Sequence, residues 1–134
     1  MVTMTMFYRE PQGEGEFFDE QQYHAHYVPG ALRIAGKYRC RRVQLSRTIA
    51  NREGIRGGTS IYRITQFTFD TLDDAMAFVF SPERTELGQT SRLHFRGSAE
   101  VFYTEDEVYE YDADGQLVHW EGPMSDLVME KVRS

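Results

Sequence analysis

Apolar and polar residues follow the period of two that is typical of β-strands in several parts of the chain. The clearest strand is predicted over residues 60–69, where polar and apolar positions separate onto two faces. Residues 2–8 alternate apolar residues with threonine, and residues 38–49 place apolar positions among arginines. Shorter extended segments are expected over residues 101–103 and 108–111. These segments predict a sheet of about four strands.

Two parts of the chain have helical spacing instead. Residues 17–28 place Phe17, Phe18, Ala25 and Val28 on one face, and the following Pro29-Gly30 pair is expected to end this helix. A second helix is predicted to begin at Thr71, because its hydroxyl and the carboxylate of Asp74 form a variant capping box. Ser81-Pro82 has the pattern of a further helix start, and Gly88 is expected to close that short helix.

The C-terminal part is predicted to be a hairpin followed by a short helix. Asp114-Gly115 is a strong hairpin signal between Tyr111 and Leu117, and residues 124–132 have the pattern of a final helix. The earlier elements follow the order βαββαβ, which is the ferredoxin-like arrangement of an α+β protein. The glycine-rich loop at residues 51–58 is too short to be a linker, so residues 1–134 are expected to form a single domain.

Composition and charge exclude several classes of function. The net charge of −6 leaves no basic stripe for nucleic acid. No apolar run is long enough to cross a membrane, and the N-terminus lacks the features of a signal peptide. Cys40 is the only cysteine, so no internal disulfide can form and a cytoplasmic location is expected.

A cluster of titratable side chains stands out in the first helix. Tyr23, His24, His26 and Tyr27 lie within five residues, in a chain with only four histidines. Imidazole and phenol groups can move protons without a cofactor. On an ideal helix, His24 falls about 70° from the centre of the apolar face, whereas His26 and Tyr27 each fall about 130° away. His24 is therefore expected to border the pocket and His26 to face solvent.

Several short pieces resemble a known family. The strand ending at Tyr8, the pattern Phe18…Tyr23…Val28-Pro29, the strand-to-helix junction at residues 67–75 and the following Ser81-Pro82-Glu83 are similar to the EthD-like group of the dimeric α+β barrel superfamily. The resemblance covers about residues 2–111 and leaves residues 112–134 as an extension. It implies a homodimer in which two four-stranded sheets form one barrel, with a pocket between each sheet and its helices. The segment after Leu117 is expected in that interface.

The resemblance also bears on the chemistry. Most relatives need no metal or organic cofactor, and the family usually places a histidine two residues before the proline of the first helix. This chain has Tyr27 at that position, so the family's histidine cannot be carried over directly. His24 and His26 would diverge by about 200° on a helix and cannot chelate one ion, so no metal is predicted. Haem, which some dimeric α+β barrels bind through histidine, has no further signature here.

The sequence thus predicts a cofactor-independent enzyme that acts on a hydrophobic, aromatic or polyketide-like small molecule. Dehydration, cyclisation or isomerisation would proceed by proton transfer, with His24 as general base and tyrosines stabilising an enolate. Two alternatives remain open: a cofactorless monooxygenase with the same pocket, and a non-catalytic protein that binds a small molecule. The candidate catalytic residues are His24, Tyr27 and His26, and the candidate substrate-binding residues are Tyr8, Tyr23, Tyr62, Gln66 and His94.

Overall fold

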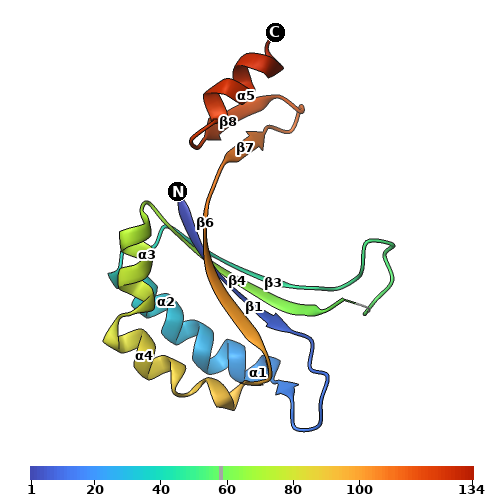
Figure 1. The fold of residues 1–134 in the computed structure, drawn as a ribbon, viewed down its shortest axis with the longest axis vertical. Helices are drawn as coiled ribbons and strands as arrows, with labels where there is room; N and C mark the ends of the chain where they lie inside the picture. The colour runs from blue at the N-terminus through green and yellow to red at the C-terminus, as the bar shows by residue number, and fades with distance from the viewer. Residues whose placement is uncertain (58) are drawn as a thin grey trace.

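A computed structural model describes residues 1–57 and 59–134 of the chain. Four strands form an antiparallel sheet in the order β3-β4-β1-β6, and the helices that follow β1 and β4 lie together on one side of it (Figure 1). The α+β, ferredoxin-like βαββαβ prediction is confirmed. The strands are β1 (Val2–Arg9), β3 (Arg42–Arg47), β4 (Ile61–Phe69) and β6 (Ala99–Glu105).

The two faces of the sheet differ because successive side chains of a strand point to opposite sides. Met4 of β1 pairs with Phe67 of β4, and both are buried beneath the helices. Thr3 pairs with Thr68 on the opposite face, where their hydroxyls lie 3.1 Å apart. The main core therefore lies between the sheet and the helices. Its other fully packed members include Phe69, Ala31, Ala35, Ala75 and Phe78.

The first helical segment differs from the prediction at both ends. Residues 17–28 do not form one helix, because Phe17–Phe18 is a short strand, β2, that pairs with β5 (Phe95–Arg96). The helical part then runs continuously through α1 (Glu20–Gln22), the π-helical turn η1 (Tyr23–Tyr27) and α2 (Val28–Lys37). Pro29-Gly30 therefore lies inside helical structure and does not end it.

The wide turn of η1 explains why the proline is tolerated. The N–H of Val28 bonds to the carbonyl of Tyr23, five residues earlier, so the turn before Pro29 is wider than an α-helical turn. A proline ring normally clashes with the carbonyl four residues before it, and widening that turn relieves the clash. The predicted strand at residues 38–49 is also shorter than expected, since Tyr38 caps α2 and β3 begins at Arg42.

Both predicted N-caps of the second helical region are confirmed. The Thr71 hydroxyl accepts a hydrogen bond from the Asp74 N–H at the start of α3 (Leu72–Val79). The Ser81 hydroxyl accepts one from the Arg84 N–H at the start of α4 (Pro82–Gly88). A 3₁₀ turn, η2 (Ser91–Leu93), then leads into β5.

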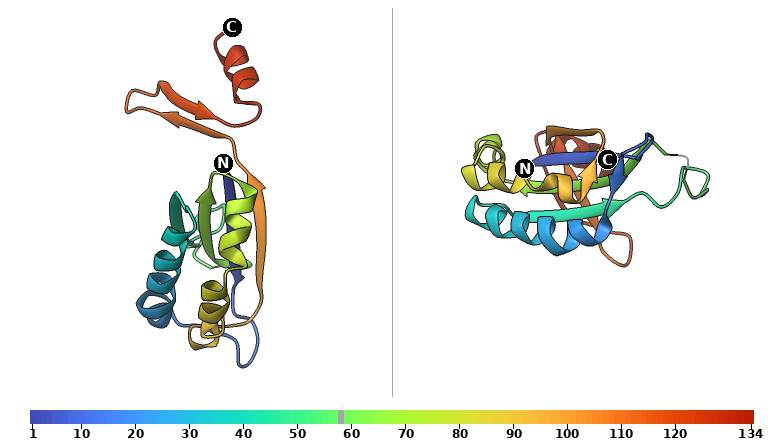
Figure 2. Two further views of the ribbon diagram at one scale, coloured as in Figure 1. Left: turned by 90° about the vertical axis from the view of Figure 1, so that its left-hand side faces the viewer. Right: turned by 90° about the horizontal axis from the view of Figure 1, so that it is seen from below.

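The C-terminal residues form an arm that projects beyond the end of the sheet (Figures 1 and 2). It consists of the hairpin β7 (Val108–Tyr111) and β8 (Leu117–Glu121), followed by α5 (Ser125–Val132). The hairpin and short helix were both predicted. Gly115 adopts a φ of +80° in the turn, which few other residues adopt without strain.

Two further observations complete the description. The predicted polar loop over residues 51–58 includes Gly58, which lies outside the described residues. Within the described ranges, every helix is too short or too polar to cross a bilayer.

Candidate functional site

A buried histidine lies in an aromatic cluster between the sheet and the first helical segment. His94 is 2% exposed. Its ring centroid lies 4.7 Å from that of Tyr27, 5.3 Å from that of Tyr23 and 6.1 Å from that of Tyr8. The ring of Phe18 is 5.7 Å away. We call these five residues the His94 cluster.

Four separate parts of the fold bring this cluster together. Tyr8 lies near the end of β1, with its side chain on the helix-covered face of the sheet. Tyr23 and Tyr27 lie one turn apart on η1, and their rings stack at 5.7 Å with an interplanar angle of 15°. The segment before β5 positions His94, whose carbonyl accepts a 2.7 Å hydrogen bond from the Asp19 N–H.

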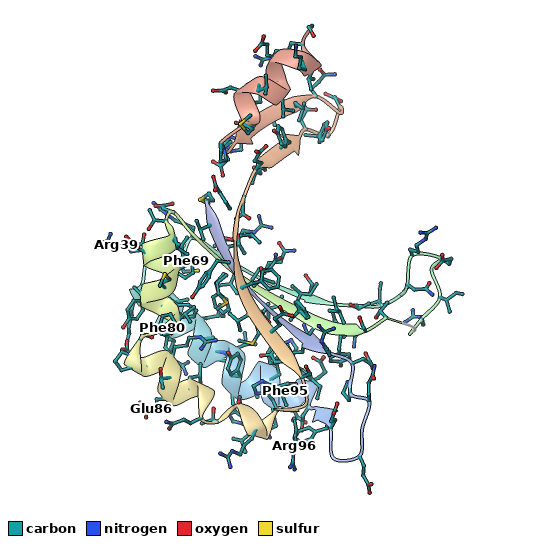
Figure 3. All side chains as sticks on the ribbon, in the orientation of Figure 1. Arg39, Phe69, Phe80, Glu86, Phe95 and Arg96 are labelled. Atoms are coloured by element: carbon teal, nitrogen blue, oxygen red, sulfur yellow. The ribbon has the colours of Figure 1, made fainter. Side chains whose placement is uncertain are left out.

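Phe18 and His94 are held close by the small β2–β5 sheet, because Phe18 pairs with Phe95. Phe95 also contacts Tyr8, with ring centroids 4.8 Å apart. Figure 3 shows Phe95 at the end of the molecule opposite the C-terminal arm. The cluster therefore closes one end of the core.

The imidazole of His94 has an unsatisfied nitrogen. Its Nε2 atom is buried and has no hydrogen-bond partner, the one such side-chain atom found among the described residues. Burial lowers the pKa of His94 from 6.5 to about 4, against a smaller opposing effect of Asp19. At neutral pH the ring is therefore uncharged. Its tautomer decides whether the unpartnered Nε2 atom is a hydrogen-bond acceptor or a donor.

Burial raises the pKa values of the tyrosines in the cluster, whereas it lowers that of His94. Burial raises the pKa of Tyr23 to about 12, although a hydrogen bond with Thr65 and the nearby charge of Arg63 partly oppose this. Burial also raises the pKa of Tyr8 and of Tyr27 above the ordinary value of 10.0. All three phenols remain protonated at neutral pH. The cluster thus combines a neutral imidazole with three hydroxyl donors.

An ion pair beside the cluster joins α1 to β4. Arg63 is bound by both carboxylate oxygens of Glu20, with Nε–Oε1 and Nη2–Oε2 distances of 3.0 and 2.7 Å. Tyr62 donates a 2.7 Å hydrogen bond to the same carboxylate. Burial alone would raise the pKa of Glu20, but the hydrogen bonds from Arg63 and Tyr62 lower it below 4.5. The Arg63 guanidinium also lies 5.1 Å above the Tyr23 ring.

Four of the predicted site residues come together in the structure: Tyr8, Tyr23, Tyr27 and His94 lie in one cluster. Tyr62 and His24 lie at its border, where their rings are 5.1 Å from Phe18 and 5.2 Å from Tyr23, respectively. Tyr62 binds Glu20, and Gln66 lines a polar pocket of about 360 Å³ on the other face of the sheet.

The helical phase predicted for His24 and Tyr27 is wrong. The side chain of His24 is 49% exposed, and its Nδ1 atom lies 2.8 Å from the Glu20 carbonyl oxygen. His26 is exposed as expected, but Tyr27 is buried instead of facing away from the core. The difference arises because Phe17 and Phe18, which have helical spacing relative to Ala25 and Val28, belong to β2 and not to the helix. The catalytic roles assigned to His24, His26 and Tyr27 remain predictions.

Sequence reasoning missed several residues around the cluster, among them Phe18 and Thr65. Thr65 is 2% exposed and its hydroxyl lies 2.5 Å from that of Tyr23. The alternation of β4 was a usable signal, because Arg63, Thr65 and Phe67 share the face that the helices cover. The apolar neighbours of His94, which are Leu93 and Phe95, also indicated a buried histidine.

The space next to the cluster is closed in this structure. The gap lined by Tyr23, Tyr27, Thr65 and Phe67 has no volume for a water molecule. No group of three or more histidine, cysteine, aspartate or glutamate residues in the described ranges is arranged to hold a metal ion.

The fold is shared with solved structures of small proteins. An EthD family protein from Bacillus halodurans has a TM-score of 0.57 at 16% identity, over 79% of this chain and 98% of that protein. An EthD-like protein from Ralstonia eutropha has a TM-score of 0.60 at 14% identity, over 77% and 89%. The hydroxynitrile lyase from Passiflora edulis has a TM-score of 0.55 at 10% identity, over 77% and 91%.

These similarities confirm the fold that the EthD-like resemblance implies, which is the fold of the ferredoxin-like dimeric α+β barrel proteins. No protein-family model matches the sequence, and no curated protein matches it significantly. The unmatched share of the chain is about a fifth, which is the size of the C-terminal arm.

Proposed function

We propose that the protein is a cofactor-independent enzyme that transfers protons on a hydrophobic, aromatic or polyketide-like small molecule at the His94 cluster. The observation that carries this proposal is the buried, unpartnered Nε2 atom of His94 among three tyrosines. A buried polar atom without a partner costs free energy. A bound ligand that hydrogen-bonds to Nε2 would remove this cost, which gives the unpartnered histidine a role in ligand binding.

The chemistry follows from the protonation states. Neutral His94 accepts a proton from an acidic C–H or O–H group of the substrate, and the freed electron pair moves onto a carbonyl oxygen. The hydroxyls of Tyr8, Tyr23 and Tyr27 stay protonated because burial raises their pKa values, so they can donate hydrogen bonds to this oxyanion. Return of the proton from His94 to another atom of the substrate gives isomerisation. Transfer of that proton to a departing hydroxyl group, which leaves as water while the enolate re-forms its carbonyl and a C=C bond, gives dehydration.

The position of His94 also relates to the family pattern. The EthD-like family that the sequence resembles usually places a histidine where this chain has Tyr27. The imidazole of His94 lies against the Tyr27 ring, with the ring centroids 4.7 Å apart. We propose that His94 supplies the imidazole from a different part of the chain. His24 is half-exposed and held by Glu20, so we assign it to the surface of η1 and not to the reaction.

Substrate access requires movement, because the space beside the cluster is closed. The smallest element that covers the cluster is the pair of two-residue strands β2 and β5, which carry Phe18 and Phe95. Short strands with few hydrogen bonds open at low cost. A substrate ring would replace the Phe18 and Phe95 rings as neighbours of Tyr8.

A non-catalytic binding role is the second candidate, and one observation favours it. The pKa of His94, about 4, makes the closed form a weak base. In a binding protein the same nitrogen would only accept a hydrogen bond from the ligand. Opening of the cluster to admit the substrate would let water and the substrate's carbonyl or hydroxyl group reach the ring and raise this pKa, which is what the catalytic proposal requires.

A panel assay tests the proposal. It compares wild-type protein and His94→Phe on aromatic polyketides, aromatic lactones and an aromatic hydroxynitrile, the last because a hydroxynitrile lyase shares the fold. We expect turnover of at least one class by the wild type and a loss of about 10² to 10⁴ in kcat/KM in the variant. Binding without turnover would select the second candidate, and equal turnover by both proteins would contradict the assigned site.

A further inference from the structure

Three hydrogen-bond donors beside the His94 cluster converge on one carboxylate. Arg63 donates to Glu20 through Nε and Nη2, at 3.0 and 2.7 Å, and the Tyr62 hydroxyl donates to the same group at 2.7 Å. The Arg63 side chain is 8% exposed. Planar guanidinium groups recognise carboxylates through two parallel hydrogen bonds of this kind. We call Arg63 and Tyr62 the carboxylate receptor.

The carboxylate receptor borders the His94 cluster through two aromatic rings. The Arg63 guanidinium carbon lies 5.1 Å from the centre of the Tyr23 ring, and the ring centroids of Tyr62 and Phe18 are 5.1 Å apart. The ring centroids of Phe18 and His94 are 5.7 Å apart. The Phe18 ring therefore contacts both the carboxylate receptor and the imidazole.

Phe18 and Glu20 belong to one short segment of the chain. Residues 17–20, which we call the lid segment, comprise β2, the cap residue Asp19 and the first residue of α1. The segment is held to β5 by strand pairing and to the His94 carbonyl by the Asp19 N–H. It thus places an aromatic ring against His94 and, two residues later, a carboxylate in the carboxylate receptor.

Opening of the lid segment would leave the carboxylate receptor without its carboxylate. The substrate ring proposed above displaces Phe18, and Glu20 follows it so closely in the chain that the two are expected to move together. A buried guanidinium that has lost its charged partner is unfavourable. A substrate with a carboxylate of its own would restore the ion pair with Arg63, whereas a neutral substrate would not.

We propose that the substrates are aromatic carboxylates and that Arg63 determines this specificity. In the closed structure, Phe18 and Glu20 occupy the positions of the substrate's ring and carboxylate. On binding, the substrate carboxylate accepts the hydrogen bonds of Arg63 and Tyr62, and the ring contacts His94. This proposal rests on the proposed function for the place where the ring binds, and it adds a charged group to the substrate.

Isothermal titration calorimetry with a matched pair of probes tests the proposal on the full chain. The probes are phenylpropanoate and phenylpropanamide, which share the aromatic ring and differ in the charge of the other end. We expect the wild type to bind the carboxylate at least about tenfold more tightly than the amide, because hydrogen bonds to a charged group are stronger than those to a neutral one.

Two variants break the ion pair from opposite sides. Glu20→Gln keeps the guanidinium and removes the competing carboxylate, so its affinity for phenylpropanoate should rise about tenfold. Arg63→Met also releases the lid segment but lacks the guanidinium, so it should bind the two probes with equal affinity. Glu53→Gln removes a negative charge from an exposed side chain that pairs with Arg52, and as the control it should match the wild type.

The outcomes separate this proposal from the proposed function, because neither probe has to react. Equal affinities of Glu20→Gln for the two probes, or no binding of phenylpropanoate by this variant, would overturn the proposal. A preference for the carboxylate that persists in Arg63→Met would also overturn it. Circular dichroism verifies folding, and if Arg63→Met does not fold, the comparison of probes in Glu20→Gln decides alone.

The panel assay gives an independent result for the reaction. Turnover of neutral substrates by the wild type, with no preference for the carboxylate in Glu20→Gln, would leave the proposed function in place and overturn the specificity for carboxylates. The expected preferences without turnover of any substrate would support the specificity and contradict the reaction.

Discussion

The imidazole ring of His94 is tilted by 48° against the phenol ring of Tyr27, with the ring centroids 4.7 Å apart. One residue comes from η1 and the other from the segment that precedes β5. Their contact joins the π-helical turn η1 to a buried histidine from a distant part of the chain. The candidate site is therefore a product of tertiary packing and not of one local motif.

Replacing His94 should separate stability from activity. His94→Phe removes the unpartnered Nε2 atom and keeps an aromatic ring in an aromatic cluster. We expect the free energy of unfolding at pH 7 to stay level or to rise by about 1–3 kcal/mol, because a buried unsatisfied group is removed. Chemical denaturation measures this, with His26→Phe at an exposed position as the control. A decrease of several kcal/mol would show that His94 has a structural role.

The pKa of His94 predicts a pH dependence of stability. The ordinary value is 6.5 and the value in the folded protein is about 4, so the unfolded chain takes up the proton first as the pH falls. The stability that neutral His94 contributes is complete above pH 6.5 and is lost between pH 6.5 and pH 4. The loss should reach roughly 3 kcal/mol at most. Denaturation curves of the wild type should show this component and those of His94→Phe should lack it.

Tyr27→Phe should reduce activity without unfolding the protein. Its ring would keep the stacking contact with Tyr23 and the contact with His94, whereas the hydroxyl donor would be lost. Removal of one donor to an oxyanion costs about 10² to 10³ in kcat, and we expect a loss near the lower value because Tyr8 and Tyr23 remain. Tyr111→Phe in the arm is the matched control, since that residue is 66% exposed. Equal kcat values for both variants would remove Tyr27 from the mechanism.

The ion pair of Glu20 and Arg63 should matter for stability. Glu20→Gln leaves the Arg63 guanidinium, whose side chain is 8% exposed, without its charged partner. Loss of one member of a buried pair costs about 3–5 kcal/mol, and the 32% exposure of the Glu20 side chain reduces our expectation to about 2 kcal/mol. His24→Ala should change the free energy of unfolding by less than about 0.5 kcal/mol. If the two variants were equally stable, the ion pair would not contribute to the stability of the fold.

Local patterns predicted most of the fold. The caps at Thr71 and Ser81, the alternation in β4 and the turn at Gly115 each depend on nearby residues, and all are present. The first helical segment was harder to predict. Phe17 and Phe18 have helical spacing relative to Ala25 and Val28, but their pairing with β5 across the chain decides their structure.

The candidate site also depends on contacts between distant parts of the chain, which local patterns do not predict. Tyr8, Tyr23, Tyr27 and His94 were recognised as residues that can carry chemistry, but the sequence did not show that they meet. The burial of His94 depends on the β2–β5 pairing and on η1, whose wide turn has no simple sequence signal. Helical phase alone favoured His24, because an ideal α-helix that starts at Phe17 places His24 nearer than Tyr27 to the centre of the apolar face.

Proton exchange with solvent is the most direct test of the central claim that the His94 cluster transfers protons. The measurement is the rate at which deuterium from D₂O enters an enolisable aromatic ketone or lactone selected by the panel assay, followed by mass spectrometry. We expect exchange catalysed by the wild type and by His24→Ala at similar rates, and a rate at least about 10² lower for His94→Phe. Undiminished exchange by His94→Phe, or its loss in His24→Ala alone, would contradict the account.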